Sequence, residues 1–366
     1  MRKNLREGFT TGSAATAAAM SALRVLLGGH KPDSIEIPLP EKGCLVIPVE
    51  RVELSGLNAR AVVIKDGGDD PDATNGHEIH AVVEHIAGND DLRVEISGGI
   101  GVGKVTLPGL PVPVGEPAIN PAPRKQIITG ILKEISETAP QLRGTIKVRI
   151  EVPQGEAIAL KTMNSRLGIL GGISILGTQG IVRPFSHASW EASIALAVSV
   201  AKAAGIEKII FTTGRRSERF YLEHFPETPQ LAMIQAADFF KGSMLEAETK
   251  GIREVHWSIF IGKLVKHAMG FPYTHAKDWR IDFALLAKWC EELNIDRTIT
   301  AEIAGANTAR QVFDMITESS KKMFIDMLIA KAEKNALFFT LKKHMIIKYH
   351  LFDFDGNLLN GNDKNC

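Results

Sequence analysis

The chain lacks the features of a secreted, membrane-spanning or nucleic-acid-binding protein. Its 366 residues include three cysteines, Cys44, Cys290 and Cys366, whose scattered positions argue against a disulfide framework or a zinc knuckle. No apolar run approaches the ~20 residues that a membrane span needs, and the first residues have no signal-peptide character. The 43 basic and 42 acidic residues nearly cancel, so no overall charge attracts nucleic acid or an anionic membrane. We expect a soluble cytoplasmic protein with neither as a partner.

A change in composition predicts two domains, residues 1–185 and 186–366. Residues 34–183 are dense in glycine and proline. Apolar segments in this region predict short strands at 44–54, 59–65, 92–97 and 145–152. A helix is expected at 124–138. This pattern is typical of an α+β domain with functional loops between its strands.

The second region alternates helical sequence with short apolar runs. It predicts a helix at 186–204 and strands at 208–211, 232–237 and 255–261. Such alternation indicates an α/β domain with a parallel sheet. Ligands of these sheets bind beyond the carboxyl ends of the strands. The residues expected there are Thr212, Thr213, Gly214, Arg215, Asp238, Gly262 and Lys263.

Residues 8–13, GFTTGS, run into an alanine-rich helix expected at 14–27, and we call them the helix-start loop. Glycines and hydroxyls at a helix start leave backbone N–H groups free at the positive end of the helix dipole, which suits a carboxylate or phosphate. The alternative is an ordinary helix cap. The candidate binding residues of this loop are Thr10, Thr11, Gly12 and Ser13.

Four carboxylates lie within seven positions of the segment KDGGDDPDATNG, residues 65–76, which we call the acidic loop. So many like charges are costly unless they are solvated, paired with cations or bound to a ligand. Their spacing does not fit a calcium-binding loop. Lys65 is a candidate binding residue, and a solvated turn is the alternative. The candidate catalytic residues are Asp66, Asp69 and Asp70.

The segment SGGIGVGKV at 97–105, the lysine loop, contains the spacing G-x₄-G-K of a phosphate-binding loop. Val105 stands where that loop needs a magnesium-binding Ser or Thr, and the prolines that follow prevent a helix. The nucleotide triphosphatase and dinucleotide-binding interpretations therefore fail. What remains is a loop whose glycines let the backbone approach a large flat ligand. Its candidate binding residues are Gly99, Gly101, Gly103 and Lys104.

A second glycine-rich segment, LGILGGISILGTQGIVRP, covers residues 167–184, and we call it the crossover loop. Its apolar residues indicate buried strand, and its glycines indicate another close approach of the backbone to a ligand. A tightly packed crossover between domains is the alternative. Its candidate binding residues are Gly177, Thr178 and Arg183.

No metal site is expected. His77, Glu78, His80 and His85 resemble metal ligands, but they miss the zinc-protease spacing H-E-x-x-H by one residue. No cysteine of the sequence falls near them to complete a zinc site.

Taken together, these loops resemble the cobalt-precorrin-5B C(1)-methyltransferase family of the anaerobic cobalamin pathway. The matching segments are residues 8–12, 65–76, 98–121 and 164–184, with weaker matches at Gly262, Lys263, Lys266 and residues 273–275. Two positions depart from the family pattern. Ala14 replaces a usual cysteine, which excludes a cysteine nucleophile there, and the turn at 238–242 is longer than usual.

The resemblance implies an α+β amino-terminal domain and a Rossmann-like α/β carboxy-terminal domain. It implies methylation of carbon 1 of cobalt-precorrin-5B to give cobalt-precorrin-6A, with S-adenosylmethionine as co-substrate and cobalt present only within the corrinoid substrate. It also implies that neighbouring pathway enzymes hand the corrinoid over. The acidic loop would bind the donor's ribose hydroxyls or sulfonium, or assist a proton transfer. The candidate anchors for the substrate's carboxylates are Lys65, Lys104, Arg124, Arg166, Arg183 and Arg215.

Two other function classes remain open on the sequence alone. A phosphate-ester or nucleotide-binding enzyme that uses the lysine loop would bind ATP or GTP and not S-adenosylmethionine. A non-catalytic tetrapyrrole carrier would bind the corrinoid and have no saturable site for the methyl donor.

Overall fold

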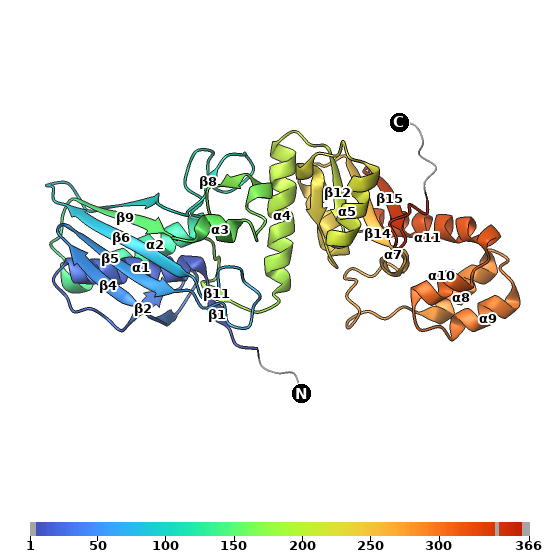
Figure 1. The fold of residues 1–366 in the computed structure, drawn as a ribbon, viewed down its shortest axis with the longest axis horizontal. Helices are drawn as coiled ribbons and strands as arrows, with labels where there is room; N and C mark the ends of the chain where they lie inside the picture. Colours follow the sequence, from blue (N-terminus) through green and yellow to red (C-terminus); the bar gives the residue numbers. More distant parts are fainter. Residues whose placement is uncertain (1–4, 341–343, 361–366) are drawn as a thin grey trace. The chain divides into compact units, whose positions relative to one another are not determined.

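The computed structural model describes residues 5–340 and 344–360, and it divides into two compact units (Figure 1). Unit 1 is Met1–Ser186 and unit 2 is His187–Cys366. Within the described ranges, no helix is long and apolar enough to cross a membrane.

Unit 1 combines short strands with two long helices. Its strands are β1 (Gly8–Phe9), β2 (Ser34–Pro38), β3 (Cys44–Pro48), β4 (Arg51–Ser55), β5 (Asn58–Ile64), β6 (Glu78–Ile86), β7 (Arg93–Gly98), β8 (Lys104–Val105), β9 (Thr145–Glu151), β10 (Ile169–Leu170) and β11 (Ile181–Val182). Its helices are α1 (Thr11–Leu26), α2 (Pro121–Thr138), α3 (Gly155–Ala159) and the 3₁₀ turn η1 (Ser165–Leu167).

A five-stranded sheet in the order β4-β5-β6-β9-β7 supports unit 1. Its strands pair antiparallel except β7, which runs parallel to β9. Side chains alternate across the sheet, so that on β9 Ile146, Val148 and Ile150 are buried while Lys147 and Arg149 are exposed. Helix α1 packs on β5, β6 and α2, and Figure 1 shows both helices beside this sheet.

Helix α1 fits between the sheet and α2 because its side chains are small. Its alanines from Ala14 to Ala22 are fully buried. On α2, a Cβ atom added to Gly130 would lie 2.7 Å from the sulfur of Met20. The two helices therefore approach closely only because residue 130 has no side chain, and the apolar area buried between them stabilises the unit.

Three element boundaries in unit 1 differ from those expected. Segment 44–54 forms two strands instead of one, because β3 pairs with β2 while β4 pairs with β5. Helix α1 begins at Thr11, three residues early, since the side chain of Thr10 caps it by accepting the Ser13 N–H at 3.2 Å. Helix α2 begins at Pro121, where proline suits the first helical position.

Backbone packs directly on backbone around Gly101. This residue has φ +68°, and a Cβ atom there would lie 1.8 Å from the carbonyl oxygen of Val152. Added Cβ atoms on Gly155 and Gly172 would lie 2.0 Å and 2.1 Å from the carbonyl oxygen of Gly101. The expectation of space for a flat ligand beside Gly101 is therefore wrong, because the chain itself fills that space.

Unit 2 is built from a small sheet and many helices. Its strands are β12 (Lys208–Thr212), β13 (Met233–Gln235), β14 (Glu254–Phe260) and β15 (Ile346–Phe352). Its helices are α4 (His187–Ala203), α5 (Arg215–His224), α6 (Phe240–Thr249), α7 (Ile261–Ala268), α8 (Phe283–Glu292), α9 (Arg297–Ala304), α10 (Ala309–Met315), α11 (Glu318–Phe338) and the 3₁₀ turn η2 (Gln230–Ala232).

The strands of unit 2 form one parallel sheet in the order β13-β12-β14-β15. The parallel sheet expected from the alternation of strands and helices is thus confirmed. In β12, Ile209, Ile210 and Phe211 are fully buried, as in a strand that is covered on both faces. The chain passes from β12 through α5 to β13 on one side, then through α6 to β14 on the other side of β12.

Every tryptophan and tyrosine of the sequence belongs to unit 2. These residues are Trp190, Trp257, Trp279, Trp289, Tyr221, Tyr273 and Tyr349. The aromatic residues of unit 1 are Phe9 and Phe185. Intrinsic tryptophan fluorescence therefore reports on unit 2, whereas circular dichroism reports on both units.

A buried pair of histidines lies on β14 and β15. His256 donates from Nε2 to Glu254 at 2.7 Å, because a carboxylate can only accept. Its Nδ1 therefore carries the lone pair of the ring, and it lies 3.1 Å from the Tyr221 hydroxyl and 2.9 Å from His350 Nε2. Burial, and then the neighbouring His256, lower the pKa of His350 to about 3. Burial also lowers the pKa of His256.

We predict that unit 2 loses stability as the pH falls below about 6.5. The unfolded chain takes up a proton on His350 near pH 6.5, whereas the folded chain does not until about pH 3. Full stability is therefore present above pH 6.5 and declines toward pH 3, by up to ~1.4 kcal/mol per pH unit for this group. Urea titrations followed by tryptophan fluorescence at pH 7.5 and 5.0 measure the decline. A His350→Asn variant with the same decline would contradict the prediction.

We predict that Gly101→Val unfolds unit 1 or destabilises it by more than ~3 kcal/mol, because overpacking and backbone strain each cost roughly 1–3 kcal/mol. Gly115→Val is the matched control, since Gly115 also has positive φ but an added Cβ meets no atom within 4 Å. The control should lose only about 1–2 kcal/mol. Thermal melts followed by far-ultraviolet circular dichroism compare the variants, and equal losses would contradict the packing argument.

Candidate functional site

The helix-start loop and the acidic loop lie against each other in unit 1. The Phe9 N–H donates to the Asp66 carbonyl oxygen at 2.8 Å. The guanidinium of Arg6 donates to both carboxylate oxygens of Asp66. A Cβ atom on Gly8 would lie 2.3 Å from the carbonyl carbon of Gly67, so these two loops are also in direct backbone contact.

Hydroxyl groups join the helix-start loop to the crossover loop. Thr11 Oγ1 donates to the carbonyl oxygen of Leu176 and accepts the N–H of the same residue, both at 3.0 Å. Ser13 Oγ donates to the carbonyl oxygen of Gly180 at 2.8 Å. Two hydroxyls and three main-chain groups are thereby satisfied within the protein.

The start of α1 is not an open anion site. The Gly12 N–H donates to Leu176 at 3.1 Å, and the Ser13 N–H donates to Thr10 Oγ1 at 3.2 Å. A Cβ atom on Gly177 would lie 2.2 Å from Thr10 Oγ1, so the crossover loop covers this helix end. The expectation of free N–H groups is wrong for Gly12 and Ser13, because the chain itself occupies them.

The lysine loop pairs with the crossover loop. Strands β8 and β10 place Lys104 opposite Leu170, and the Gly103 N–H donates to the Ile173 carbonyl oxygen at 2.8 Å. Residues 106–120 contain no helix, and a phosphate-binding loop requires one. The structure therefore agrees with the sequence in rejecting a nucleotide triphosphatase, and it brings all four loops together.

Lys65 forms a buried ion pair with Asp72 inside the acidic loop. Its side chain is 1% exposed, and its Nζ donates to Asp72 at 2.5 Å. Asp72 also accepts from the N–H and the hydroxyl of Thr74 at 2.7 Å and 2.6 Å. Lys65 is therefore not exposed to anchor a substrate carboxylate, because its side chain is buried in an ion pair.

The three candidate catalytic carboxylates all take part in hydrogen bonds. The hydrogen bond from Arg6 lowers the pKa of Asp66, which makes that carboxylate a weak base. Asp69 accepts the Arg6 N–H at 2.7 Å, and Asp70 accepts the Phe185 N–H at 3.0 Å. These contacts hold chain segments together, and a catalytic role for the three carboxylates stays a prediction.

Arg124 and Arg183, like Lys65, have structural partners. Arg124 donates from Nε to the Ile119 carbonyl oxygen at 2.9 Å, which ties α2 to the loop before it. Arg183 forms an ion pair with Glu7 at 3.2 Å, with 65% of its own side chain exposed. Arg124 is therefore less available to a ligand than Arg183.

Lys104 lies on an exposed apolar rim. Leu170, opposite it in the β8–β10 pair, is 52% exposed, and Ile100 in the same loop is 67% exposed. Thr178 is exposed on the crossover loop, and Arg166 lies in η1. A cation beside exposed apolar side chains suits a ligand with an apolar face and a carboxylate edge.

A second polar cluster lies at the carboxyl edge of the sheet in unit 2. Lys263 donates to Asp238 Oδ1, and the Thr274 hydroxyl donates to the same oxygen at 2.9 Å. Burial, and then the charge of Lys266, lower the pKa of Lys263 to about 8. Lys266 donates to the Thr274 carbonyl oxygen at 2.7 Å. Asp238 and Lys263 thus lie beyond the ends of β13 and β14, as expected, and the ion pair between them was not foreseen.

The other residues expected at this edge follow β12. Thr213 N–H donates to Ser217 Oγ at 3.1 Å, which closes the turn into α5. Gly214 precedes that helix, and no side chain caps the helix start. Arg215 is exposed at its first position.

An aromatic group beside this edge was missed by sequence analysis. The Phe239 ring lies 5.0 Å from that of Tyr273, and His187 lies 4.6 Å from Tyr273. Trp190 stacks on Phe239 at 6.4 Å and is 45% exposed. The four rings come from three segments, with His187 and Trp190 both on α4, so no single local pattern in the sequence marks them as a group.

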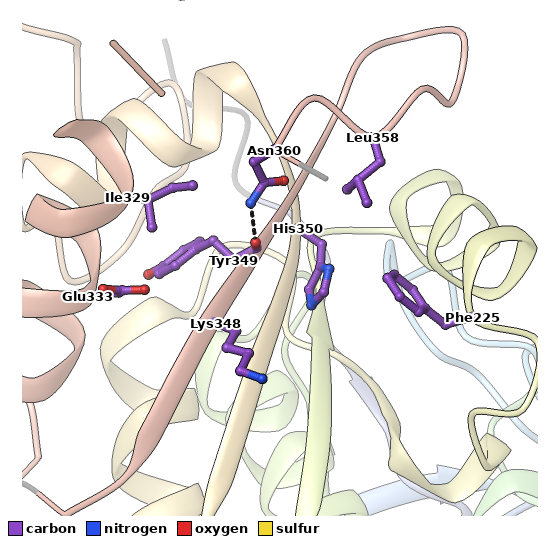
Figure 2. Close-up of a pocket in the computed structure, with 8 residues that line it drawn as sticks. All are labelled: Phe225, Ile329, Glu333, Lys348, Tyr349, His350, Leu358 and Asn360. Atoms are coloured by element: carbon purple, nitrogen blue, oxygen red, sulfur yellow. Dashed lines mark hydrogen bonds between the residues drawn. The ribbon is translucent and has the colours of Figure 1, made fainter. Parts of the chain in front are cut away.

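Figure 2 shows a pocket of about 270 Å³ beside β15. Asn360 donates there to the Tyr349 carbonyl oxygen at 2.6 Å, and His350 and Phe225 line the side toward α5. None of the sequence-predicted site residues lines this pocket. Among residues 5–340 and 344–360, no group of three or more His, Cys, Asp or Glu side chains could hold a metal ion.

Comparison with known proteins places these features in a family. The CbiD family model matches residues 1–184, and the model of the CbiD C-terminal domain matches residues 273–363. A protein of Nitratidesulfovibrio vulgaris named cobalt-precorrin-5B C(1)-methyltransferase is 44% identical over 365 residues, which cover 98% of this chain and 93% of the relative. A protein of the same name from Priestia megaterium is 46% identical over 332 residues, covering 89% and 88%.

A solved structure also matches. It is a cobalamin biosynthesis protein (cbiD) from Archaeoglobus fulgidus, 31% identical, covering 72% of this chain and 80% of that chain with a TM-score of 0.40. The family model spans half of the chain, and the relatives are similar over nearly their full length. The chain belongs to the CbiD family.

Proposed function

We propose that the chain methylates carbon 1 of cobalt-precorrin-5B in cobalamin biosynthesis, with S-adenosylmethionine as the methyl donor. The observation that carries this proposal is the 44% identity to a cobalt-precorrin-5B C(1)-methyltransferase over 98% of the chain. The loops that prompted the resemblance also lie together in unit 1, as parts of one site would.

Methyl transfer from S-adenosylmethionine depends more on the positioning of the two reactants than on reactive side chains. The sulfonium donor carries an already activated methyl group. Holding two reactants in attack geometry can supply roughly 7–11 kcal/mol of the barrier without a nucleophile in the protein. Burial raises the pKa of Cys290 to about 12, so this thiol is not a nucleophile at neutral pH. Ala14 is fully buried and offers no reactive group.

We assign the rim of unit 1 to the corrinoid. This substrate is a large ring with acetate and propionate carboxylates at its edge. Ile100 and Leu170 provide exposed apolar surface, and Lys104 provides an exposed cation beside Leu170. Charge-assisted hydrogen bonds to carboxylates contribute roughly 1.5–3 kcal/mol each. Arg166 and Arg183 are further anchors in this proposal, and neighbouring pathway enzymes deliver the ring to this rim.

We assign unit 2 to the Rossmann-like class. The parallel order β13-β12-β14-β15, with helices between consecutive strands, supports this assignment. A fold of this class fits a nucleoside-containing ligand, and its strand ends carry Asp238 and Lys263.

Mass spectrometry tests the activity directly. Purified protein incubated with cobalt-precorrin-5B and S-adenosylmethionine should convert the corrinoid to a product heavier by one CH₂ unit, and S-adenosylhomocysteine should appear in equal amount. Corrinoid binding without a mass gain would make the chain a carrier. Binding of ATP with no binding of S-adenosylmethionine would favour a nucleotide enzyme.

We predict that Lys104→Ala weakens corrinoid binding roughly tenfold, because loss of one charge-assisted contact costs about 1.5 kcal/mol. Binding of S-adenosylhomocysteine should stay within about twofold of the wild-type value. Lys147→Ala is the matched control, since Lys147 is exposed on β9 outside the four loops. Calorimetric titrations with each ligand make the comparison. Equal losses for both ligands, or the same loss in Lys147→Ala, would remove Lys104 from the corrinoid site.

A further inference from the structure

We propose that the adenosyl donor binds at the carboxyl edge of the sheet in unit 2, between the ends of β12 and β14. This inference rests on the proposed function, and it assigns one of the two reactants to a defined set of residues. The donor's ribose binds Asp238, its adenine lies on the aromatic group, and its amino-acid part lies over Gly214 and Gly262.

The topology selects this edge. From β12 the chain moves to β13 on one side of the sheet, and from β13 it crosses to β14 on the other side. The chain that follows β12 leads to β13 on one side, whereas the chain that follows β14 leads to β15 on the other side, so the direction of the connections reverses between β12 and β14. Ligands of open parallel sheets bind at such a switch point.

The backbone is unobstructed at both of these strand ends. Gly214 follows β12 and Gly262 follows β14, and a Cβ atom added to either one would meet no atom within 4 Å. Most other glycines with such open surroundings have strongly positive φ and lie in turns. Gly262 has no positive φ, so its lack of a side chain is not required by the local conformation. A ligand that approaches the backbone closely at Gly262 explains why this position has no side chain.

Asp238 occupies the position of a ribose-binding acid. In folds of this kind a carboxylate about 20 residues after the first glycine turn binds the ribose hydroxyls, and Asp238 follows Gly214 by 24 residues. Ala237 before it has φ +51°, a strained conformation for a residue with a side chain. Thr274 and Lys263 fix one carboxylate oxygen. The strain and the two donors together hold Asp238 in one orientation.

Phe239, which belongs to the aromatic group, directly follows this acid in the chain. The ring centroid of Phe239 lies 5.0 Å from that of Tyr273 and 6.4 Å from that of Trp190. Tyr273 is adjacent in sequence to Thr274. Stacking of a flat base on an aromatic ring contributes roughly 1–3 kcal/mol. The turn after β12 holds a single glycine and lacks G-x-G-x-x-G, so a pyrophosphate does not fit. An adenosyl group without phosphates suits this combination.

The test measures binding of S-adenosylhomocysteine by calorimetry to the full chain and to Gly262→Val. The valine adds bulk where the free protein has open space, so the fold should persist. We expect at least a tenfold loss of affinity. Gly305→Val is the matched control, because Gly305 is an exposed glycine of unit 2 without positive φ and its nearest atom is 3.6 Å from an added Cβ. The control should bind as the wild type does.

A second variant, Asp238→Asn, should also lose at least tenfold, and tryptophan fluorescence checks that unit 2 stays folded. If the wild type binds S-adenosylhomocysteine and both variants bind it equally well, this inference fails while the proposed function stands. If NADP⁺ binds in a Gly262-dependent manner and S-adenosylhomocysteine does not, the ligand class is wrong. If the wild type neither binds S-adenosylhomocysteine nor methylates the corrinoid, the proposed function fails first.

Discussion

Direct contact of backbone with backbone is the constraint on which unit 1 depends. At Gly101, Gly155 and Gly172 the chain segments approach so closely that any Cβ atom would overlap a main-chain atom, and Gly8 packs on Gly67 in the same way. Contacts between main-chain atoms do not change with side-chain rotamers. They also bury main-chain polar groups, which must then find partners within the loops. The hydroxyls of Thr11 and Ser13 supply such partners to the main chain of Leu176 and Gly180 in the crossover loop.

This constraint changes the meaning of the glycine-rich motifs. Taken alone, glycines and hydroxyls at a helix start predict a site for an anion, and the structure shows that they join the helix-start loop to the acidic loop and the crossover loop. The groups left for a ligand lie at the rim of that assembly, where Lys104 and Leu170 are exposed. The motif therefore fixes the loops against one another, and in the proposed site the less distinctive residues beside it contact the ligand.

Periodicity predicted several of the regular elements well, although it missed β2 and β6. The strands expected at 145–152 and 208–211 and the helix at 186–204 all form within about two residues of those bounds. Long-range partners could not be predicted. Nothing local indicates that Lys65 is buried against Asp72, that Val152 fills the space beside Gly101, or that the rings around Phe239 gather. Those facts depend on tertiary packing, which a pattern of apolar residues does not encode.

A rigid platform is also what this reaction requires. A methyl group on a sulfonium needs no activation by the protein, and Cys290 and Asp66 are poorly suited to provide any, since burial raises the pKa of the thiol and Arg6 lowers the pKa of the carboxylate. Catalysis then depends on how accurately each reactant is held, and a shift of about 1 Å can cost a hundredfold in rate. Loops fixed by main-chain contacts move less than loops fixed by long side chains. The abundance of glycine in unit 1 is therefore consistent with catalysis by positioning.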